Sequence, residues 1–331
     1  MTATLRRGLP AVALTGAAAV IVILAAPFIG STSISLARVF STTLPFSDNV
    51  DAQIFFLARL PRAVAAAVVG GALAAAGVIL QGLLRNPLAT PYTLGVSTGA
   101  ALGAMIAITY GAMLPAGGVA LASLVGAFVA VLVVYALASA RHRGLSTTVL
   151  LLAGVTLNAF FSALILFVQY LSDFAQTYRA LRWLMGDLDV AGYGPIIWAL
   201  PFMGAAFLAF AWLARPMNLL SLGAEAAGTR GLDVVRAQRV AFFSASLATG
   251  AAVSIGGPIG FVGIIIPHLV RLVVGADHRL VLPVSTFVGA AFLVACDVVA
   301  RTVFAPMELP VGIVTALIGG PFFLWLLLRK T

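Results

Sequence analysis

The chain has 331 residues, of which 62% are hydrophobic and only 9% are charged. About a quarter of the residues in a soluble domain are charged, so the composition excludes a soluble protein and predicts an all-α protein that crosses a membrane many times. The net charge of +9 is explained by basic residues that flank the spans, and no run of basic and aromatic residues suggests a nucleic-acid surface.

Ten apolar segments predict ten transmembrane helices in a single domain, residues 1–331, because one span needs about 20 apolar residues. The first segment follows Arg6 and Arg7 and is long for the apolar part of a signal peptide, so we expect a retained helix. Residues 30–58 and 171–192 are polar connections expected outside, and residues 215–236 are expected inside. The predicted spans are 9–29, 62–82, 93–110, 116–139, 147–170, 193–213, 237–255, 260–275, 281–299 and 310–328.

The distribution of charge predicts the orientation of these helices. With the N-terminus inside, 13 of the 19 Lys and Arg residues lie on the inner side, and 7 of the 10 Asp and Glu residues lie outside. Cytoplasmic loops are enriched in basic residues, so both termini are predicted to be cytoplasmic.

The connection between the second and third predicted spans interrupts a hydrophobic helix. Residues 77–100 read GVILQGLLRNPLATPYTLGVSTGA. Asn86 precedes Pro87, which disfavours helical geometry at Asn86 and removes a backbone donor. Glycines at every fourth position from 95 to 103 then allow another helix to approach closely. We predict an inner turn, followed by a tightly packed third span. The turn residues are Arg85, Asn86 and Pro87.

The inner segment 215–236 reads RPMNLLSLGAEAAGTRGLDVVR. Gly223 predicts a bend between two short helices, a shape that suits a cleft in a soluble partner, although an ordinary amphipathic loop is the alternative. The candidate contact residues are Asn218, Leu219, Leu220, Ser221, Leu222, Gly223, Glu225, Ala226 and Ala227.

Three arginines lie near the outer ends of predicted spans. Arg59 and Arg62 stand in A-R-L-P-R before the second span, and Arg301 follows Asp297 by four residues near the end of the ninth. They are interpreted as anchors at the headgroups, as an Asp297–Arg301 pair, or as a cationic docking surface for another protein.

Residues 256–271 read GGPIGFVGIIIPHLVR, and place Pro267, His268 and Arg271 within the eighth predicted span. The glycines favour an irregular entry and close backbone packing. His142 and His278 lie in predicted inner loops and are expected at the surface.

Candidate catalytic and metal-binding groups are scarce in this sequence. No His, Cys, Asp or Glu cluster has metal-ligand spacing, and Cys296 lies in an apolar run where it is expected to pack. No G-x-x-x-x-G-K-[ST] loop is present, and the one lysine is Lys330. If ATP drives transport, its hydrolysis must therefore occur on another polypeptide.

Several blocks together resemble the FecCD family, the permease subunits of type II ABC importers for iron-siderophores, haem and cobalamin. The blocks are 77–100, 215–236, 256–271 and the C-terminal E-L-P-V-G-I-V-T-A-L-I-G-G-P-F-F at 308–323. The resemblance implies a homodimer of ten-helix permeases in a bacterial inner membrane, with the pathway along the dimer interface. It also implies two ATPase subunits that bind ATP-Mg, a periplasmic substrate-binding protein, and no cofactor or catalytic residue in this chain.

The resemblance also implies roles for particular residues. Segment 215–236 matches the element that docks on the ATPase, although Met217 and Ala224 depart from the family pattern, so the contacts there are expected to differ in strength. The arginines at 59, 62 and 301 match positions that meet the binding protein. Ser146 and Thr147 resemble the position where relatives narrow the cytoplasmic exit, and Ser146 is equally well placed as a helix N-cap.

The substrate implied by the resemblance is a bulky metal-chelate, with haem as the first choice and an iron-siderophore or cobalamin as the alternatives. His268 occurs in relatives that carry different chelates, so it is expected to make a structural or gating hydrogen bond, not to ligate haem. An ion-coupled secondary transporter and a passive channel are the other classes. The former needs ionisable residues in mid-membrane, whereas the acids here lie in loops and at span ends.

Overall fold

The computed structural model describes residues 3–41, 43–111, 117–140, 145–190 and 192–329, which form helices and connections without a strand. Each of the ten predicted spans is present as a helix. Seven of these helices are long and apolar enough to cross a membrane, and three are shorter apolar helices. The ten are α1 (Ala3–Ala25), α4 (Leu60–Leu84), α5 (Val96–Tyr110), α6 (Gly118–Ser139), α7 (Thr147–Tyr170), α9 (Gly194–Leu220), α11 (Val234–Gly256), α12 (Val262–Val274), α13 (His278–Thr302) and α14 (Val311–Arg329).

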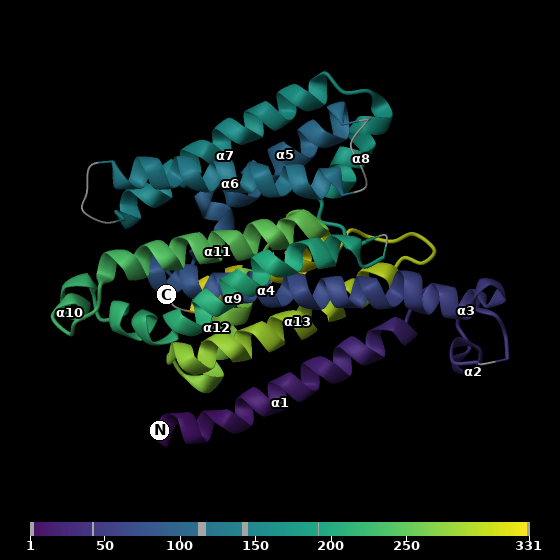
Figure 1. Cartoon of the computed structure of the whole chain (residues 1–331), viewed down its shortest axis with the longest axis horizontal. Coiled ribbons are helices and arrows are strands. Elements are labelled where there is room, and N and C mark those ends of the chain that lie inside the picture. Colours follow the sequence, from purple (N-terminus) through teal and green to yellow (C-terminus); the bar gives the residue numbers. More distant parts are fainter. Residues whose placement is uncertain (1–2, 42, 112–116, 141–144, 191, 330–331) are drawn as a thin grey trace.

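Helix α4 forms the centre of the bundle, with α9, α11, α12 and α13 packed around it (Figure 1). Its small residues allow very close approach of the neighbouring backbones. A Cβ built on Gly77 would lie 2.1 Å from the carbonyl oxygen of Gly263 on α12, so only glycine fits at this crossing. Half of the buried residues of α4 are alanine or glycine, which lets its neighbours pack closely against its backbone.

A second group of helices, α5, α6 and α7, lies beside this bundle, and α1 lies along its opposite side (Figure 1). The predicted glycine ladder of the third span packs α5 against α6. A Cβ on Gly103 would lie 2.1 Å from the carbonyl oxygen of Ala122. The prediction of a closely packed third span is thus confirmed.

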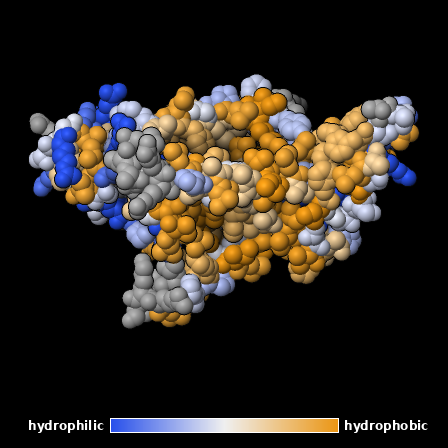
Figure 2. Space-filling view, turned by 90° about the horizontal axis from the view of Figure 1, so that it is seen from below, coloured by the Kyte–Doolittle hydropathy of each residue, from blue (hydrophilic) through white to orange (hydrophobic). Residues whose placement is uncertain are grey.

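The two ends of the helix bundle carry different short elements (Figure 1). One end holds the short helices α2 (Leu36–Val39), α3 (Val50–Gln53) and α8 (Phe174–Leu184), and the other holds α10 (Ala224–Gly228) and the N-terminus. Figure 2 shows a broad hydrophobic band between more hydrophilic ends, which suits a bilayer. We name these ends the outer and the inner end, after the orientation that the charge distribution predicts.

The outer connections contain more helix than the sequence predicted. Residues 30–58 end in α3 and in a π-helical turn, η3 (Ile54–Arg59), which runs directly into α4. Residues 171–192 contain α8, whose N-terminus is closed by a capping box between Asp173 and Gln176. Local caps and apolar residues on one face stabilise these short helices, which the polarity of the segments did not indicate.

The inner segment 215–236 also differs from the prediction in one respect. The expected first short helix is the end of α9, which continues through Pro216 to Leu220. The bend at Gly223 is present, with φ of 107°, and α10 follows it. That backbone conformation strains any residue with a side chain, so glycine is the residue suited to this position.

Candidate functional site

At the outer end, two of the three singled-out arginines bind backbone carbonyl groups where the first span ends. Arg301 Nη2 donates to Ala26 O at 2.7 Å, and Arg59 Nη1 donates to Pro27 O at 3.3 Å. Arg59 also donates to Thr32 O. These carbonyls lie in and after η1 (Ala26–Phe28), the short helix that closes α1. The last carbonyls of a helix lack partners within it and carry its negative dipole end, so the arginines cap the first span.

The third arginine, Arg62, joins three parts of the chain through a buried ion pair with Asp297 and a partly exposed one with Glu308. Its Nε lies 2.8 Å from Asp297 Oδ1 on α13, and its Nη1 lies 2.5 Å from Glu308 Oε2 before α14. Arg301 Nε lies 3.6 Å from Asp297 Oδ2. The Asp297–Arg301 ion pair, one of the three interpretations that the sequence allowed for these arginines, is therefore present. Removing one member of such a buried network leaves the others uncompensated.

These contacts add a structural role that the sequence did not assign to the arginines. All three are buried in the free chain, with the guanidinium groups turned to internal acceptors. Their docking of a binding protein stays a prediction, and it now requires that partner carboxylates reach groups that already have partners.

At the inner end, the predicted partner-contact residues divide into an exposed set and a packed set. Leu222 is 55% exposed, a large apolar side chain at the tip of the segment, and Glu225 and Ser221 are exposed beside it. Leu220 and Ala227 are buried and hold the segment on the bundle. An exposed leucine next to polar residues suits a protein contact.

Asn218 from this segment ties α9 to the start of α13. Its Nδ2 donates to Asp277 Oδ1 at 2.7 Å, and its Oδ1 lies 2.9 Å from the backbone N of His278 and 2.8 Å from its ring Nδ1. His278 is consequently only 6% exposed. The prediction of a surface histidine was wrong, because its neighbour in the sequence, Asp277, caps α13 and turns the ring toward α9. His142 lies outside the described residues.

The carboxylate of Asp277 is fully engaged by donors. Arg279 Nη2 lies 2.7 Å from Asp277 Oδ2, and Arg279 also donates from its backbone N. The hydrogen bonds from Arg279, joined by the one from Asn218, lower the pKa of Asp277 to about 2. This acid is therefore ionised at neutral pH, and its charge is balanced within the corner between α12 and α13.

The predicted turn after α4 lies against the same inner segment. Arg85 closes α4 in the left-handed conformation, with φ of 48°, and Asn86 Oδ1 accepts from Leu88 N at 2.9 Å. A Cβ built on Gly223 would lie 3.8 Å from Arg85 Nη1. The prediction that Arg85, Asn86 and Pro87 join the second and third spans is confirmed, and the structure places this turn beside Gly223 of segment 215–236.

Arg271 of the 256–271 block is hydrogen-bonded to the side chain of Gln81 on α4, which in turn binds the backbone of α12. Its Nη1 donates to Gln81 Oε1, and Gln81 Nε2 donates to Gly263 O at 3.0 Å. Pro267 is buried within α12, and His268 is half-buried one residue later. The gating roles expected for these residues stay predictions.

A polar cavity of about 350 Å³ opens between these inner elements. Its walls come from the end of α4 and its turn, the end of α9, and the corner between α12 and α13. The residues that line it are Gln81, Gly82, Arg85, Asn86, Pro87, Ser221, Arg271, Ala276 and His278.

The two predicted gate residues stand at the start of α7. Ser146 is its N-cap, and Ser146 Oγ accepts from Val149 N at 3.4 Å. Thr147 is the first helical residue, and both side chains are half-buried. The N-cap alternative for Ser146 is therefore confirmed, whereas the gating role of the pair stays a prediction.

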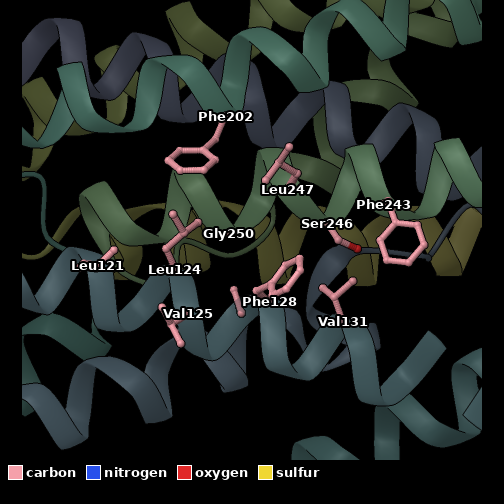
Figure 3. A pocket seen from close by; sticks show the side chains of 11 residues that line it. Leu121, Leu124, Val125, Phe128, Val131, Phe202, Phe243, Ser246, Leu247 and Gly250 are labelled. Atoms are coloured by element: carbon pink, nitrogen blue, oxygen red, sulfur yellow. The ribbon is translucent and has the colours of Figure 1, made fainter. Parts of the chain in front are cut away.

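A second cavity, of about 450 Å³, lies within the apolar band between α6, α9 and α11. Leu124, Phe128 and Leu247 form its walls, and the hydroxyl of Ser246 is the polar group among the labelled side chains (Figure 3). A crevice with such walls suits hydrocarbon and offers no charged group to a polar ligand. Among the described residues, no cluster of three or more His, Cys, Asp or Glu could hold a metal ion.

Comparison with known proteins identifies the family to which this chain belongs. The model of the FecCD transport family matches residues 18–329. The chain belongs to the FecCD transport family. It is 45% identical to the cobalamin import system permease protein BtuC of Halobacterium salinarum, over 88% of this chain and 78% of that protein. It is 39% identical to the hemin transport system permease protein HmuU of Yersinia pestis, over 94% and 93% of the two chains.

A solved structure has the same arrangement of helices. It represents an inward-facing conformation of a transporter assigned to the metal-chelate ABC type, and it superposes with a TM-score of 0.83 at 34% identity. The superposition covers 97% of this chain and 99% of that chain. The predicted fold class, an all-α multi-pass permease of the type II ABC importer kind, is confirmed.

Proposed function

We propose that this chain is the membrane-spanning permease subunit of a binding-protein-dependent ABC importer for a bulky metal-chelate. The observation that carries the proposal is the likeness over nearly the whole chain to a metal-chelate type transporter, in both sequence and fold. The sequence has no phosphate-binding loop, and its one lysine is the penultimate residue. ATP-Mg is therefore expected on separate ATPase subunits that dock at the inner end.

Energy transfer in such an assembly follows from the continuity of the inner segment with the helices. Segment 215–236 joins α9 to α11, and both helices pack on the central α4. Movement of docked ATPase subunits would pull on Leu222 and on α10, and rigid helices would carry that displacement into the membrane.

Haem is the substrate that we place first, and cobalamin second. Haem is supported by the hemin permease relative, which aligns with almost the full length of both chains. Cobalamin is supported by the 45% identity to a cobalamin permease. Both compounds are large metal-macrocycle chelates, and an iron-siderophore is the further alternative by the same mechanism.

Reconstitution with the ATPase and binding protein tests the proposal. We expect labelled haem or cobalamin to accumulate in proteoliposomes only when ATP is present, and the binding protein to retain the same compound during purification. Uptake driven by an ion gradient without ATP would identify a secondary transporter, and failure of the chain to associate with any ATPase would also contradict the proposal.

The proposal also includes the assembly predicted from the family, in which two copies of this chain form a homodimer in a bacterial inner membrane with both termini cytoplasmic. The exposed apolar residues of α7 and α14 are compatible with burial between two copies. Cross-linking of single cysteines placed on α14, in a chain from which Cys296 has been removed, would detect the homodimer. Cross-links only to a different permease would indicate a heterodimer.

Docking of the periplasmic binding protein is proposed at the outer arginines. Charge complementarity sets orientation and association rate in such contacts. Replacing Arg59 with Glu should weaken the association and reduce its dependence on salt. The thermal stability of the variant must be measured in parallel, because Arg59 also binds the carbonyl of Pro27. Unchanged affinity and salt dependence would exclude Arg59 from the docking surface.

A further inference from the structure

The apolar cavity between α6, α9 and α11 reaches the surface that faces the bilayer. Leu121, Val125 and Phe128 line it from α6, and each of these side chains is more than half exposed. Phe202 on α9 and Leu247 on α11 form the facing walls (Figure 3). A cavity in this position meets hydrocarbon chains and not water, so the bilayer itself supplies the molecules that can fill it.

The wall that α11 contributes continues into two arginines at the inner end. Phe243, Leu247 and Gly250 line the cavity. Arg239 precedes Phe243 by four residues and Arg236 precedes it by seven, which places both on the same face of the helix as the lining residues. Both arginines are exposed. The apolar face that lines the cavity therefore ends in a pair of cations.

These two cations have no carboxylate partner within the described part of the chain. Asp233, an acid near them in sequence, is the N-cap of α11 and accepts from the backbone N of Arg236 at 3.0 Å. The guanidinium of Arg236 lies over the ring of Trp212 on α9, at 5.7 Å from its centroid. Stacking of this kind leaves the N–H groups at the edge of a guanidinium able to donate to a phosphate. Tryptophan also favours the level of the lipid headgroups.

The distance between the arginines and the far part of the cavity matches the depth of one leaflet. Arg239 and Gly250 are 11 residues apart, which corresponds to about 16 Å along a helix. The hydrocarbon of one leaflet is about 15 Å thick. A lipid whose phosphate lies beside Arg236 and Arg239 can therefore extend an acyl chain along α11 through the whole cavity.

We propose that α6, α9 and α11 form a binding site for an anionic phospholipid of the inner leaflet. The phosphate accepts hydrogen bonds from Arg236 and Arg239, and one acyl chain fills the apolar cavity. A headgroup with a net negative charge is favoured over a zwitterionic one, because the cation of the zwitterion would be held close to two arginines. Arg236 is the last residue of segment 215–236, so the bound lipid would lie beside the segment that we expect to dock the ATPase.

Native mass spectrometry of the full-length chain, released from detergent micelles after lipid has been added, tests the site. We expect one dioleoylphosphatidylglycerol to be retained per chain, with at least about fivefold preference over dioleoylphosphatidylcholine, because one cation near an anionic headgroup is worth about that factor. Dihexanoylphosphatidylglycerol has the same headgroup but chains too short to fill the cavity. It should bind at least about tenfold more weakly than the long-chain lipid, and equal retention would show that the cavity takes no part.

Matched variants separate the headgroup from the chain. Changing both Arg236→Gln and Arg239→Gln should reduce the preference for phosphatidylglycerol to about one, whereas Arg230→Gln, at an exposed cation outside this face, should leave it unchanged. Leu247→Trp puts a larger side chain into the cavity and should weaken retention at least about fivefold. Leu208→Trp, at a residue on α9 that is exposed and does not line the cavity, should not.

Three results would overturn the proposal. They are no retained lipid on the unaltered chain, as expected if a second copy covers the cavity, an unchanged preference in the double arginine variant, and equal losses in the two tryptophan variants. Thermal unfolding of each variant shows whether it is folded, and the comparison of long and short chains needs no variant. The measurement uses neither ATPase nor substrate, so it can fail independently of the importer function.

Discussion

The outer and inner ends of this protein use their arginines in opposite ways. At the outer end Arg62 and Arg301 are buried against Asp297, and Arg59 and Arg301 also bind carbonyls at the end of the first span. At the inner end Arg85 and Arg271 line an open cavity without an acidic residue among its described lining residues. The same residue type therefore ties helices together at one end of the bundle and lines an open cavity at the other.

This difference follows from where the acidic residues lie in the chain. The outer side holds most of the Asp and Glu residues, and two of them, Asp297 on α13 and Glu308 before α14, pair with Arg62 of α4. The inner side has few acidic residues, and one of them, Asp277, is already paired with Arg279. We infer that stability depends more on the outer end, and that exchange of partners takes place at the inner end.

The largest expected effect comes from removing the acid shared by the outer network. Asp297→Asn removes the carboxylate paired with Arg301 and one of the two carboxylates paired with Arg62, and should lower stability by about 3–5 kcal/mol. Thermal unfolding of the purified chain in detergent measures it. Arg182→Gln is the control, because Arg182 is 47% exposed in its pair with Asp187 and its loss should cost less than about 1 kcal/mol. Equal shifts would mean that the outer network is no more important than a surface pair.

A smaller loss is expected where the inner end is itself tied together. Asn218→Ala removes the partner of the His278 ring and one partner of Asp277, and should cost about 1–3 kcal/mol in the same unfolding assay. Ser221→Ala, on the same segment, removes only a hydroxyl bonded to a local carbonyl and should change stability by no more than about 0.5 kcal/mol. If neither variant changes the stability, the hydrogen bonds of Asn218 do not stabilise the contact between α9 and α13.

Partner exchange at the inner end is expected to depend on its exposed leucine. Leu222→Asp should leave the unfolding temperature of the chain unchanged, because the side chain is 55% exposed. It should reduce substrate-stimulated ATP hydrolysis of the assembled transporter by about tenfold, the cost of placing a charge in an apolar contact. Leu121→Asn, at a residue exposed on α6, is the control for a general effect of losing apolar surface. Unaltered hydrolysis in Leu222→Asp would show that the ATPase docks elsewhere.

The smallest expected effect is a dependence on pH. The pKa of Asp277 is lowered from 3.8 to about 2, so its ionised form stabilises the folded chain above the ordinary pKa. That contribution should be lost as the pH falls from about 4 through about 2. The midpoint of unfolding followed over this range should fall less steeply in Asp277→Asn than in the unaltered chain. Parallel curves would show that the Asp277–Arg279 contact does not contribute.

Several site residues could be predicted because their chemistry is local. The Asn86-Pro87 pair and the glycines after it predicted both the inner turn and the tight α5–α6 packing that the structure shows. Ser146 was recognised as a possible helix cap from its position alone. The pairing of Arg301 with Asp297 was foreseen from their i,i+4 spacing, whereas the contacts of Arg62 with Asp297 and Glu308 join residues more than two hundred positions apart.

The sequence by itself determined that the chain is a ten-helix membrane protein of the FecCD transport family, because hydrophobic length, charge asymmetry and ordered motifs are all properties of the linear chain. Only the tertiary structure decided which cations have partners. It buried His278, a residue that its loop-like surroundings made look exposed, and it brought Arg85, Arg271 and His278 from three separate elements to one cavity. Charge balance in a folded protein depends on distances of a few ångströms between helices, and such distances are not encoded in spacing along the chain.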